Sequence, residues 1–282
     1  MKSIGNQINS IQEFPTLPTI YLRLSQAMER NSSTAADLSK IISLDQAAAS
    51  KILKIANSSM YAFRWKITNI SQAIFNIGFI EVKNLVLSMS VLEVFNSINY
   101  YTTFSSIELW KHSIAVAVIT RNLGVSLKIK NLEDLFISGI LHDIGKLFLL
   151  TSYKQDYVDV VEYAYKNKLA IRDAEIELLG IDHCEAGEMI ADKWRLPLHL
   201  RKTIRHHHSR VPQIDSNILP TLVSVADSTA KLYEMGNSGD NVVSEISKEI
   251  WDALDLPSNI FTSLLPKIIN EYEETLGIFT ID

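Results

Sequence analysis

Apolar residues recur every three or four positions along most of the chain, the spacing that places side chains on one face of an α-helix. No segment shows the strict apolar–polar alternation of a half-buried strand. The pattern predicts helices over residues 34–42, 47–56, 71–77, 80–95, 105–127, 132–152, 186–194, 218–235, 244–254 and 260–276, and one more that starts at Pro197.

The expected helix ends carry suitable residues. Thr34 with Asp37, and Asp182 with Glu185, match the capping-box pattern at a helix start. Gly236 suits the position just past a helix end, where a left-handed backbone favours glycine. Further N-caps are expected at Ser71, at Ser105 or Ser106, and at Asn131. Loops are expected at residues 99–103, 210–217 and 236–241.

Turn-forming residues are scarce, since Gly and Pro number 10 and 7 in 282 residues. A β-sandwich or barrel would need a turn about every 8–12 residues. We therefore predict an all-α protein, a multi-helix bundle in two lobes. The expected segments are an N-terminal helical lobe (1–98), a second helical lobe with the candidate chemistry (99–235), and C-terminal helices that pack on the core (236–282).

Composition narrows the class of protein. Hydrophobic residues make up 47% and charged residues 21%, which is typical of a soluble globular chain. The net charge of −5 argues against a broad nucleic-acid-binding face, and no DNA partner is expected. The single Cys184 excludes an intrachain disulfide and suits the reducing cytoplasm. We expect no membrane span and no signal peptide.

All seven histidines lie in the second half of the chain. His142 and Asp143 stand in the apolar stretch GILHDIGKLFLL, where an ionised carboxylate is costly unless it is paired or bound to a metal. Lys146 shares their helical face, and its cation could hold a phosphate oxygen beside a metal. The alternative is that Asp143 forms a cap or a salt bridge while His142 is a satisfied core histidine.

His112 follows Glu108 by four residues, so both could serve as ligands on one helical face, or His112 could simply lie in an apolar stripe. His183 begins a helix, next to a Cys184 better explained as a small buried side chain. In the triplet that ends with His207 and His208, both of these fall near the apolar face, while His206 points away. Asp227 lies in an apolar run, which favours a buried, partnered acid.

Together these residues form an ordered candidate metal set: His112, His142, Asp143, His183, His207, His208 and Asp227. Imidazole with carboxylate favours one or two ions of Fe, Mn, Ni, Co or Zn over Mg or Ca. A two-metal site bridged by Asp143 would polarise a phosphoryl group and generate a hydroxide for in-line attack. Asp143 and Lys146 are the candidate catalytic residues.

This ordered set, with Gly145 and Lys146, resembles the metal-ligand series of the HD superfamily of phosphohydrolases. The first half adds Leu17-Pro18, ISLD at 42–45, KILKIANS at 51–58, Ile67-Thr68, QAI at 72–74 and Ile77-Gly78. With GILHDIGKL, HCEAGEMIADKWRLP and IRHHH, these segments resemble the HDOD (HD-related output) domain over about residues 14–210.

The resemblance implies a bacterial, all-helical signal-transduction protein with an HD-like core, in a family where ligands are commonly lost. This chain keeps the set but lacks the Gly-Tyr-Pro motif of relatives that hydrolyse cyclic di-GMP. We therefore expect a regulatory module with a metal site, a protein signalling partner, and a nucleotide or phosphate ligand. The alternative is an active metal-dependent phosphohydrolase. A basic cluster could attract the phosphate or be a solvated face: Lys193, Arg195, Arg201, Lys202, Arg205 and Arg210.

Overall fold

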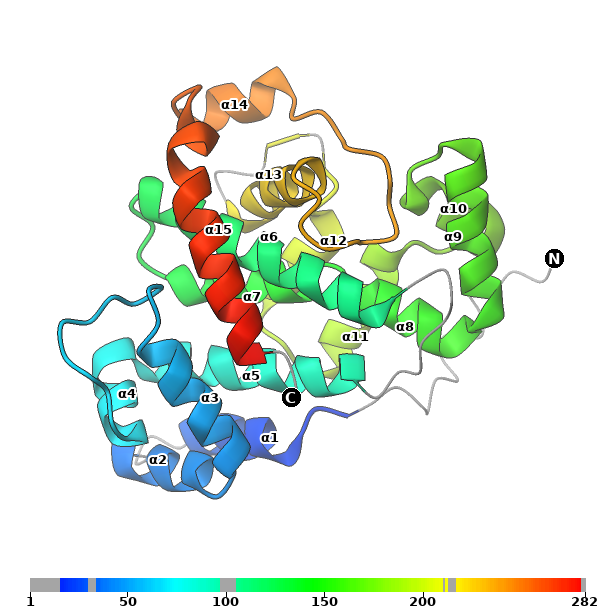
Figure 1. The fold of residues 1–282 in the computed structure, drawn as a ribbon. Coiled ribbons are helices and arrows are strands. Elements are labelled where there is room, and N and C mark those ends of the chain that lie inside the picture. The colour runs from blue at the N-terminus through cyan, green and yellow to red at the C-terminus, as the bar shows by residue number, and fades with distance from the viewer. Residues whose placement is uncertain (1–15, 30–33, 97–104, 210, 213–216, 280–282) are drawn as a thin grey trace. The chain divides into compact units, whose positions relative to one another are not determined.

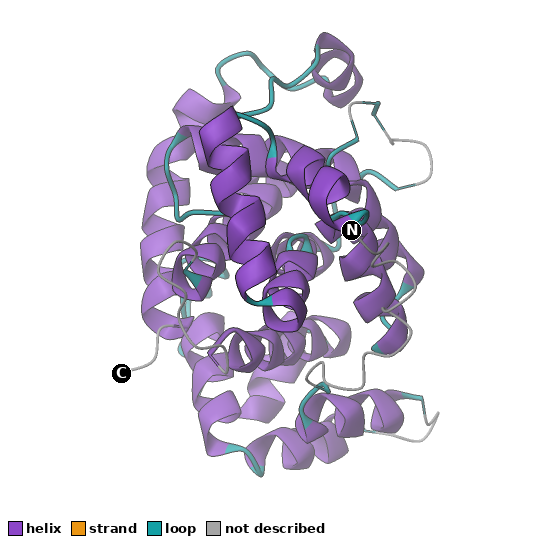
Figure 2. Cartoon of the chain, turned by 90° about the vertical axis from the view of Figure 1, so that its right-hand side faces the viewer, coloured by secondary structure: helices purple, strands orange, loops and turns teal. Residues whose placement is uncertain are grey.

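The computed structural model describes residues 16–29, 34–96, 105–209, 211–212 and 217–279. Every regular element in these ranges is a helix, which confirms the all-α prediction (Figure 2). The loop expected at 99–103 lies outside the described residues, as does most of the one at 210–217.

Contacts between Cα atoms divide the chain into two compact units. One contains residues 17–93 together with the C-terminal stretch from 261, and the other contains residues 94–260. The three segments expected from the sequence remain a prediction.

The unit of residues 17–93 and 261 onward is built from short helices (Figure 1). Its helices are α1 (Thr19–Met28), α2 (Ala35–Ser43), α3 (Gln46–Ala56), α4 (Ile70–Ile77), most of α5 (Phe79–Asn96) and most of α15 (Ile260–Phe279). Thr34 and Asp37 form the predicted capping box of α2. The N-cap of α4 is Asn69 rather than Ser71, because the Asn69 side chain accepts a hydrogen bond from the Gln72 amide.

The unit of residues 94–260 holds the candidate chemistry. Its helices are α6 (Ser106–Ser126), α7 (Leu132–Leu141), α8 (Ile144–Tyr153), α9 (Gln155–Asn167), α10 (Ile171–Leu179), α11 (His183–Lys193), α12 (Leu198–His206), α13 (Leu219–Leu232) and α14 (Lys248–Leu254). Helix α6 packs against α7 and α13, while α11 packs against α8 and α12. Sixteen of the 21 residues of α6 are buried, as expected for a helix without a wide polar face.

The prediction of a single helix over residues 132–152 is wrong. The chain forms α7 and α8, separated by His142 and Asp143. Because α7 packs on α6 while α8 packs on α11, the two helices need different directions. Gly145 permits the second contact, since a Cβ there would lie 1.8 Å from the carbonyl oxygen of His183.

The stretch Leu132–Tyr153 is long and apolar enough to cross a membrane, judged by length and composition alone. However, 89% of its most apolar window is buried inside the protein. A core helix has this property too, so the stretch is weak evidence for a span.

Two expected helix ends near the C-terminus also differ. Helix α13 ends at Leu232, so Gly236 is not its C′ residue. Gly236 has a φ of +74°, and a Cβ there would lie 2.3 Å from the backbone nitrogen of His112. The absence of a side chain at Gly236 therefore lets the backbone pass close to α6. Helix α14 begins at Lys248 rather than near residue 244, because the Ser247 side chain caps it.

We predict that Gly145→Ala lowers the free energy of unfolding by about 2–3 kcal/mol, because backbone atoms of α11 cannot yield to the added methyl group. Gly277→Ala is the matched control, since a Cβ at this helical position meets no atom of the described residues within 4 Å. The control should stabilise the protein by about 0.5–1 kcal/mol. Urea unfolding measures both changes, and equal effects of the two variants would contradict the close α8–α11 contact.

Candidate metal centre

All seven predicted metal ligands come together inside the unit of residues 94–260. They are contributed by α6 (His112), the α7–α8 junction (His142, Asp143), the start of α11 (His183), the segment after α12 (His207, His208) and α13 (Asp227). In three overlapping groups, the ligand atoms lie within 4.8 Å of one another: His112–His142–Asp227, His142–Asp143–His207 and His183–Cys184–His207–His208.

Two of the histidines are fixed in the orientation that a metal ligand needs. His142 Nδ1 lies 2.7 Å from the carbonyl oxygen of Gly139, and His207 Nδ1 lies 2.8 Å from that of Ile204. A carbonyl can only accept, so each Nδ1 carries a proton, and once Nε2 gives up its own proton its lone pair is free to bind a metal ion. Both Nε2 atoms are buried with no hydrogen-bond partner in the described chain. These two Nε2 atoms therefore lack the partner that buried polar atoms normally have.

His183 is held in the same way by a carboxylate. Its Nδ1 lies 2.6 Å from Glu175 Oε2, which also accepts from the His183 amide. The other Glu175 oxygen accepts from Tyr157. A histidine ligand that donates its second ring nitrogen to a carboxylate is a recurrent arrangement around bound metals. Its Nε2 therefore points, as an acceptor, toward His208 Nε2 at 3.0 Å.

Asp143 stands between the two sets of histidines. Its Oδ1 is 3.4 Å from His183 Nε2 and 3.6 Å from His207 Nε2, and this oxygen has no hydrogen-bond partner among the described residues. Its Oδ2 is 3.3 Å from His142 Nε2 and 2.7 Å from Lys146 Nζ. Burial alone would raise the pKa of Asp143, but His142 and Lys146 outweigh it and hold this pKa well below the usual range. Asp143 is therefore an anion placed to bridge the two sets.

Lys146 is fully buried, and its ammonium group is paired with Asp143. It does not line the pocket described below. In this arrangement Lys146 acts on Asp143, and its expected contact with a phosphate oxygen remains a prediction.

Asp227 and His112 form the other end of the centre. His112 Nε2 lies 2.9 Å from Asp227 Oδ1, and Lys231 Nζ lies 3.0 Å from Oδ2. Burial raises the pKa of Asp227, but Lys231 and then His112 outweigh this and keep the pKa well below its usual range. Lys231 also pairs with Asp240 at 3.0 Å. Asp143 and Asp227 thus each have a lysine partner.

Glu108 and His206 lie away from the cluster, whereas Cys184 lies at its edge. Glu108 pairs with Lys111 at 2.7 Å on a partly exposed face. His206 is exposed, as expected. Cys184 is buried, and its sulfur is 4.0 Å from His207 Nδ1, the nitrogen that already donates to a carbonyl. Cys184 therefore touches the side of this ring that faces away from Asp143.

Two arginines of the basic cluster expected on the α11–α12 face are ion-paired. Arg201 pairs with Asp192 at 2.6 Å, and Arg205 lies 3.4–3.6 Å from three acids, Asp182, Glu185 and Glu188. This supports a solvated, ion-paired face over a phosphate site. Arg210 lies outside the described residues.

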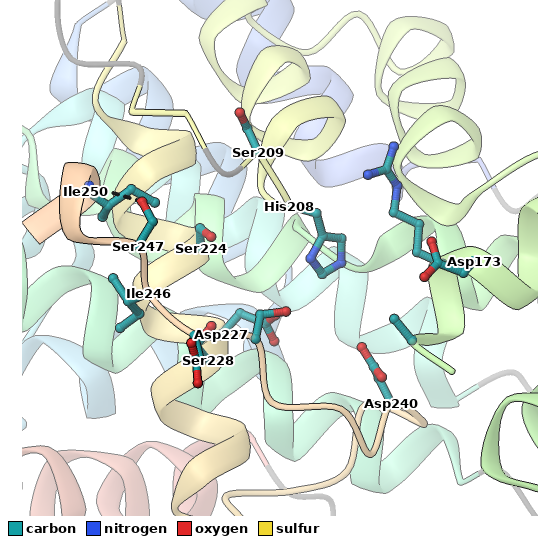
Figure 3. Close-up of a pocket in the computed structure, with 14 residues that line it drawn as sticks. Asp173, His208, Ser209, Ser224, Asp227, Ser228, Asp240, Ile246, Ser247 and Ile250 are labelled. Carbon is teal, nitrogen blue, oxygen red and sulfur yellow. Dashed lines mark hydrogen bonds between the residues drawn. The ribbon is translucent and has the colours of Figure 1, made fainter. Parts of the chain in front are cut away.

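A pocket of about 110 Å³ opens beside the cluster (Figure 3). Of the predicted ligands, His208 and Asp227 line it, and Figure 3 shows their side chains directed toward its interior. Its lining is acidic and rich in hydroxyl groups, with Asp173, Asp240 and Glu245 against one cation, Arg172. Residues 244–247, just before α14, form one wall.

The sequence argument missed two important residues. Glu175 lies on the same helical face as the buried Ile171, Ala174 and Leu179. Lys231 lies one turn after Asp227 on the buried face of α13. In both cases the available signal was a charged residue on an apolar face, which requires a buried partner.

The chain belongs to the HDOD domain family, because the family model matches residues 14–210. An uncharacterised protein of Treponema pallidum (strain Nichols) is 25% identical over 225 residues, which cover 79% of this chain and 42% of that protein. The chain thus corresponds to less than half of that relative.

Two solved structures share the fold. An HDOD domain protein with unknown function from Geobacter sulfurreducens aligns with a TM-score of 0.79 and 22% identity, covering 99% of this chain and 97% of that one. A proposed phosphohydrolase from Shewanella amazonensis SB2B aligns with a TM-score of 0.74 and 20% identity, covering 99% and 98%. At these identities the likeness establishes the fold.

We predict that chelator-treated protein loses stability as the pH falls below about 6.5. Burial, followed by the neighbouring His207 and His183, lowers the pKa of His208 well below 6.5, and burial also lowers that of His112. Below about pH 6.5 these histidines are protonated in the unfolded chain but stay neutral in the native protein. The free energy of unfolding therefore decreases as the pH is lowered. Urea unfolding at pH 7.5 and 5.5 measures this loss. His208→Gln should reduce it, whereas the exposed His206→Gln should leave it unchanged; the same loss in all three proteins would contradict the assignment.

We also predict that Asp143→Asn abolishes metal binding and, in chelator, lowers the free energy of unfolding by up to about 3 kcal/mol. The reason is that Lys146 would remain as a buried cation without its counter-ion. The double variant Asp143→Asn/Lys146→Met should regain most of this stability and still bind no metal. Melting curves with metal and with chelator separate the outcomes. A double variant no more stable than Asp143→Asn would show that the ion pair is not the cause.

Proposed function

We propose that this protein is a metal-binding regulatory module of bacterial signal transduction, acting in the cytoplasm. The observation that carries the metal assignment is the convergence of three buried atoms, His142 Nε2, His207 Nε2 and Asp143 Oδ1, for which the described residues provide no hydrogen-bond partner. Backbone carbonyl oxygens fix the orientation of the two imidazole rings. Membership of the HDOD family, which is associated with signalling, supports the regulatory role.

The ligands divide into two sets around Asp143. One contains His112, His142 and Asp227, and the other contains His183, His207 and His208. Four nitrogen and oxygen donors per ion suit Fe, Mn, Ni or Zn, with Asp143 shared. When bound, such ions supply Lewis-acid charge that can neutralise a phosphate group.

The pocket suggests how a phosphate-containing ligand reaches this centre. His208 and Asp227 are exposed to it, whereas Asp143 and Lys146 are not among its lining residues. Because the lining acids outnumber the single arginine, the pocket repels an anion unless bound cations compensate. We therefore propose that phosphate binding depends strictly on metal.

The alternative function is a metal-dependent phosphohydrolase. The observation that favours it is that the pocket ends on two of the proposed metal ligands, so a bound ester would lie beside the centre. The relative from Shewanella amazonensis supports the same possibility at the level of the fold. A purely regulatory module would bind phosphate without turnover.

We predict that protein purified without a histidine tag contains one to two equivalents of transition metal. His112→Ala and His183→Ala should each remove about one equivalent if both sets are filled, because each variant loses a ligand from one set only. Elemental analysis after reconstitution measures the content, with His206→Ala as the control. Absence of metal even after incubation with Mn, Fe, Ni and Zn would reject the proposed function.

We expect inorganic phosphate to bind metal-loaded protein and to show no binding after chelation. Isothermal titration calorimetry of both forms tests this expectation. A panel of phosphate esters then separates the two functions, since metal-dependent turnover lost in Asp143→Asn identifies an enzyme. Binding that is equally strong in chelator would contradict the metal-dependent ligand site.

A further inference from the structure

The loop between α3 and α4 is held by hydrogen bonds at both ends. In Figure 1 it extends outward from these two helices. The Asn57 side chain accepts from the Ile67 amide and donates to the Ile67 carbonyl, both at 2.8 Å, and so joins the two ends. At the base, the Ser59 amide donates to Glu274 at 3.0 Å. The loop is therefore a fixed part of its unit.

Its outer part presents a row of stacked aromatic rings. Tyr61, Phe63 and Trp65 come from an irregular stretch in which Ala62 has a left-handed backbone, with a φ of +48°. The first two rings lie 5.8 Å apart at 13°, and the next two 6.1 Å apart at 19°. Trp65, at the end of the row, is 59% exposed. A large aromatic ring left this open is available for contact with a ligand.

Cations accompany the rings. Arg64 lies between Phe63 and Trp65, and Lys66 follows Trp65. Lys54 and Lys66 both line a shallow, open depression of the surface, with Asn57 and Thr68. None of the three cations forms an ion pair with an acid of the described chain. Glu274, the carboxylate at the loop base, is engaged by Ser59. The surface formed by Lys54, Tyr61 and residues 63–66 is here called the aromatic–basic loop.

We propose that the aromatic–basic loop binds single-stranded nucleic acid. Bases would stack on the open face of Trp65, and phosphates would lie against Lys54, Arg64 and Lys66, which is how proteins bind single strands without strong sequence preference. A proline-rich peptide would use the rings without the cations, and an acidic peptide would use the cations without the rings. A single strand of nucleic acid uses both.

The overall negative charge does not conflict with this proposal, because it argues against a broad basic face such as a duplex needs. A loop with three cations and a terminal stacking platform requires little of the surface. The site lies in the other unit from the metal centre, so the proposal is independent of metal binding.

Fluorescence anisotropy of the 282-residue chain with labelled 12-nucleotide oligo(dT) and oligo(U) tests the proposal, and the two oligonucleotides distinguish DNA from RNA binding. We expect binding to either strand, with a slope of log affinity against log salt of about −2, from three cations at about 0.7 each. A 12-base-pair duplex and a polyglutamate peptide should bind at least tenfold more weakly.

Trp65→Ala should weaken oligonucleotide binding at least tenfold, as loss of one stacking partner does. Arg64→Gln should lower the salt slope by about 0.7. Tyr165→Ala is the control, because that ring is 70% exposed in the other unit and should have no effect. Equal melting temperatures show that the variants are folded. The proposal is overturned if no oligonucleotide binds, if Trp65→Ala binds as wild type does, or if polyglutamate binds equally well.

Discussion

The centre of this protein depends on charge pairing in a buried environment. Asp143 and Asp227 are both inside the protein, where an uncompensated carboxylate would be strongly unfavourable. Lys146 and Lys231 stand against them at 2.7 and 3.0 Å. The helices of the unit of residues 94–260 must therefore pack so that Lys146 stays beside Asp143 and Lys231 beside Asp227. The imidazoles are arranged around these two pairs.

Backbone geometry then determines what the imidazoles can do. The break between α7 and α8 directs His142 back toward Gly139, and the end of α12 directs His207 back toward Ile204. In both cases a carbonyl oxygen takes the Nδ1 proton and leaves an unpaired Nε2 in the interior. Glu175 does the same for His183 through a buried carboxylate. These contacts to Nδ1 distinguish the candidate metal ligands from core histidines whose two ring nitrogens both have hydrogen-bond partners.

The two units carry different chemistry. The centre in residues 94–260 is enclosed and opens to a small acidic pocket, where an anion needs bound cations. The aromatic–basic loop in the other unit is open, and its cations have no acid partner in the described chain. An HDOD protein with both features would combine a metal-linked site with a separate surface for a partner.

The sequence by itself determined the class of fold and the set of candidate ligands. Helical periodicity and the scarcity of glycine and proline sufficed for an all-α chain, and histidines and acids inside apolar runs marked His142, Asp143 and Asp227. Local patterns could not show that α7 and α8 separate at Asp143, because that break depends on what each helix packs against. They also could not show that Lys146 and Lys231 pair with the two acids, or that Glu175 orients His183. Tertiary packing decided these points, since burial and the distance between residues far apart in the chain arise only when the helices come together.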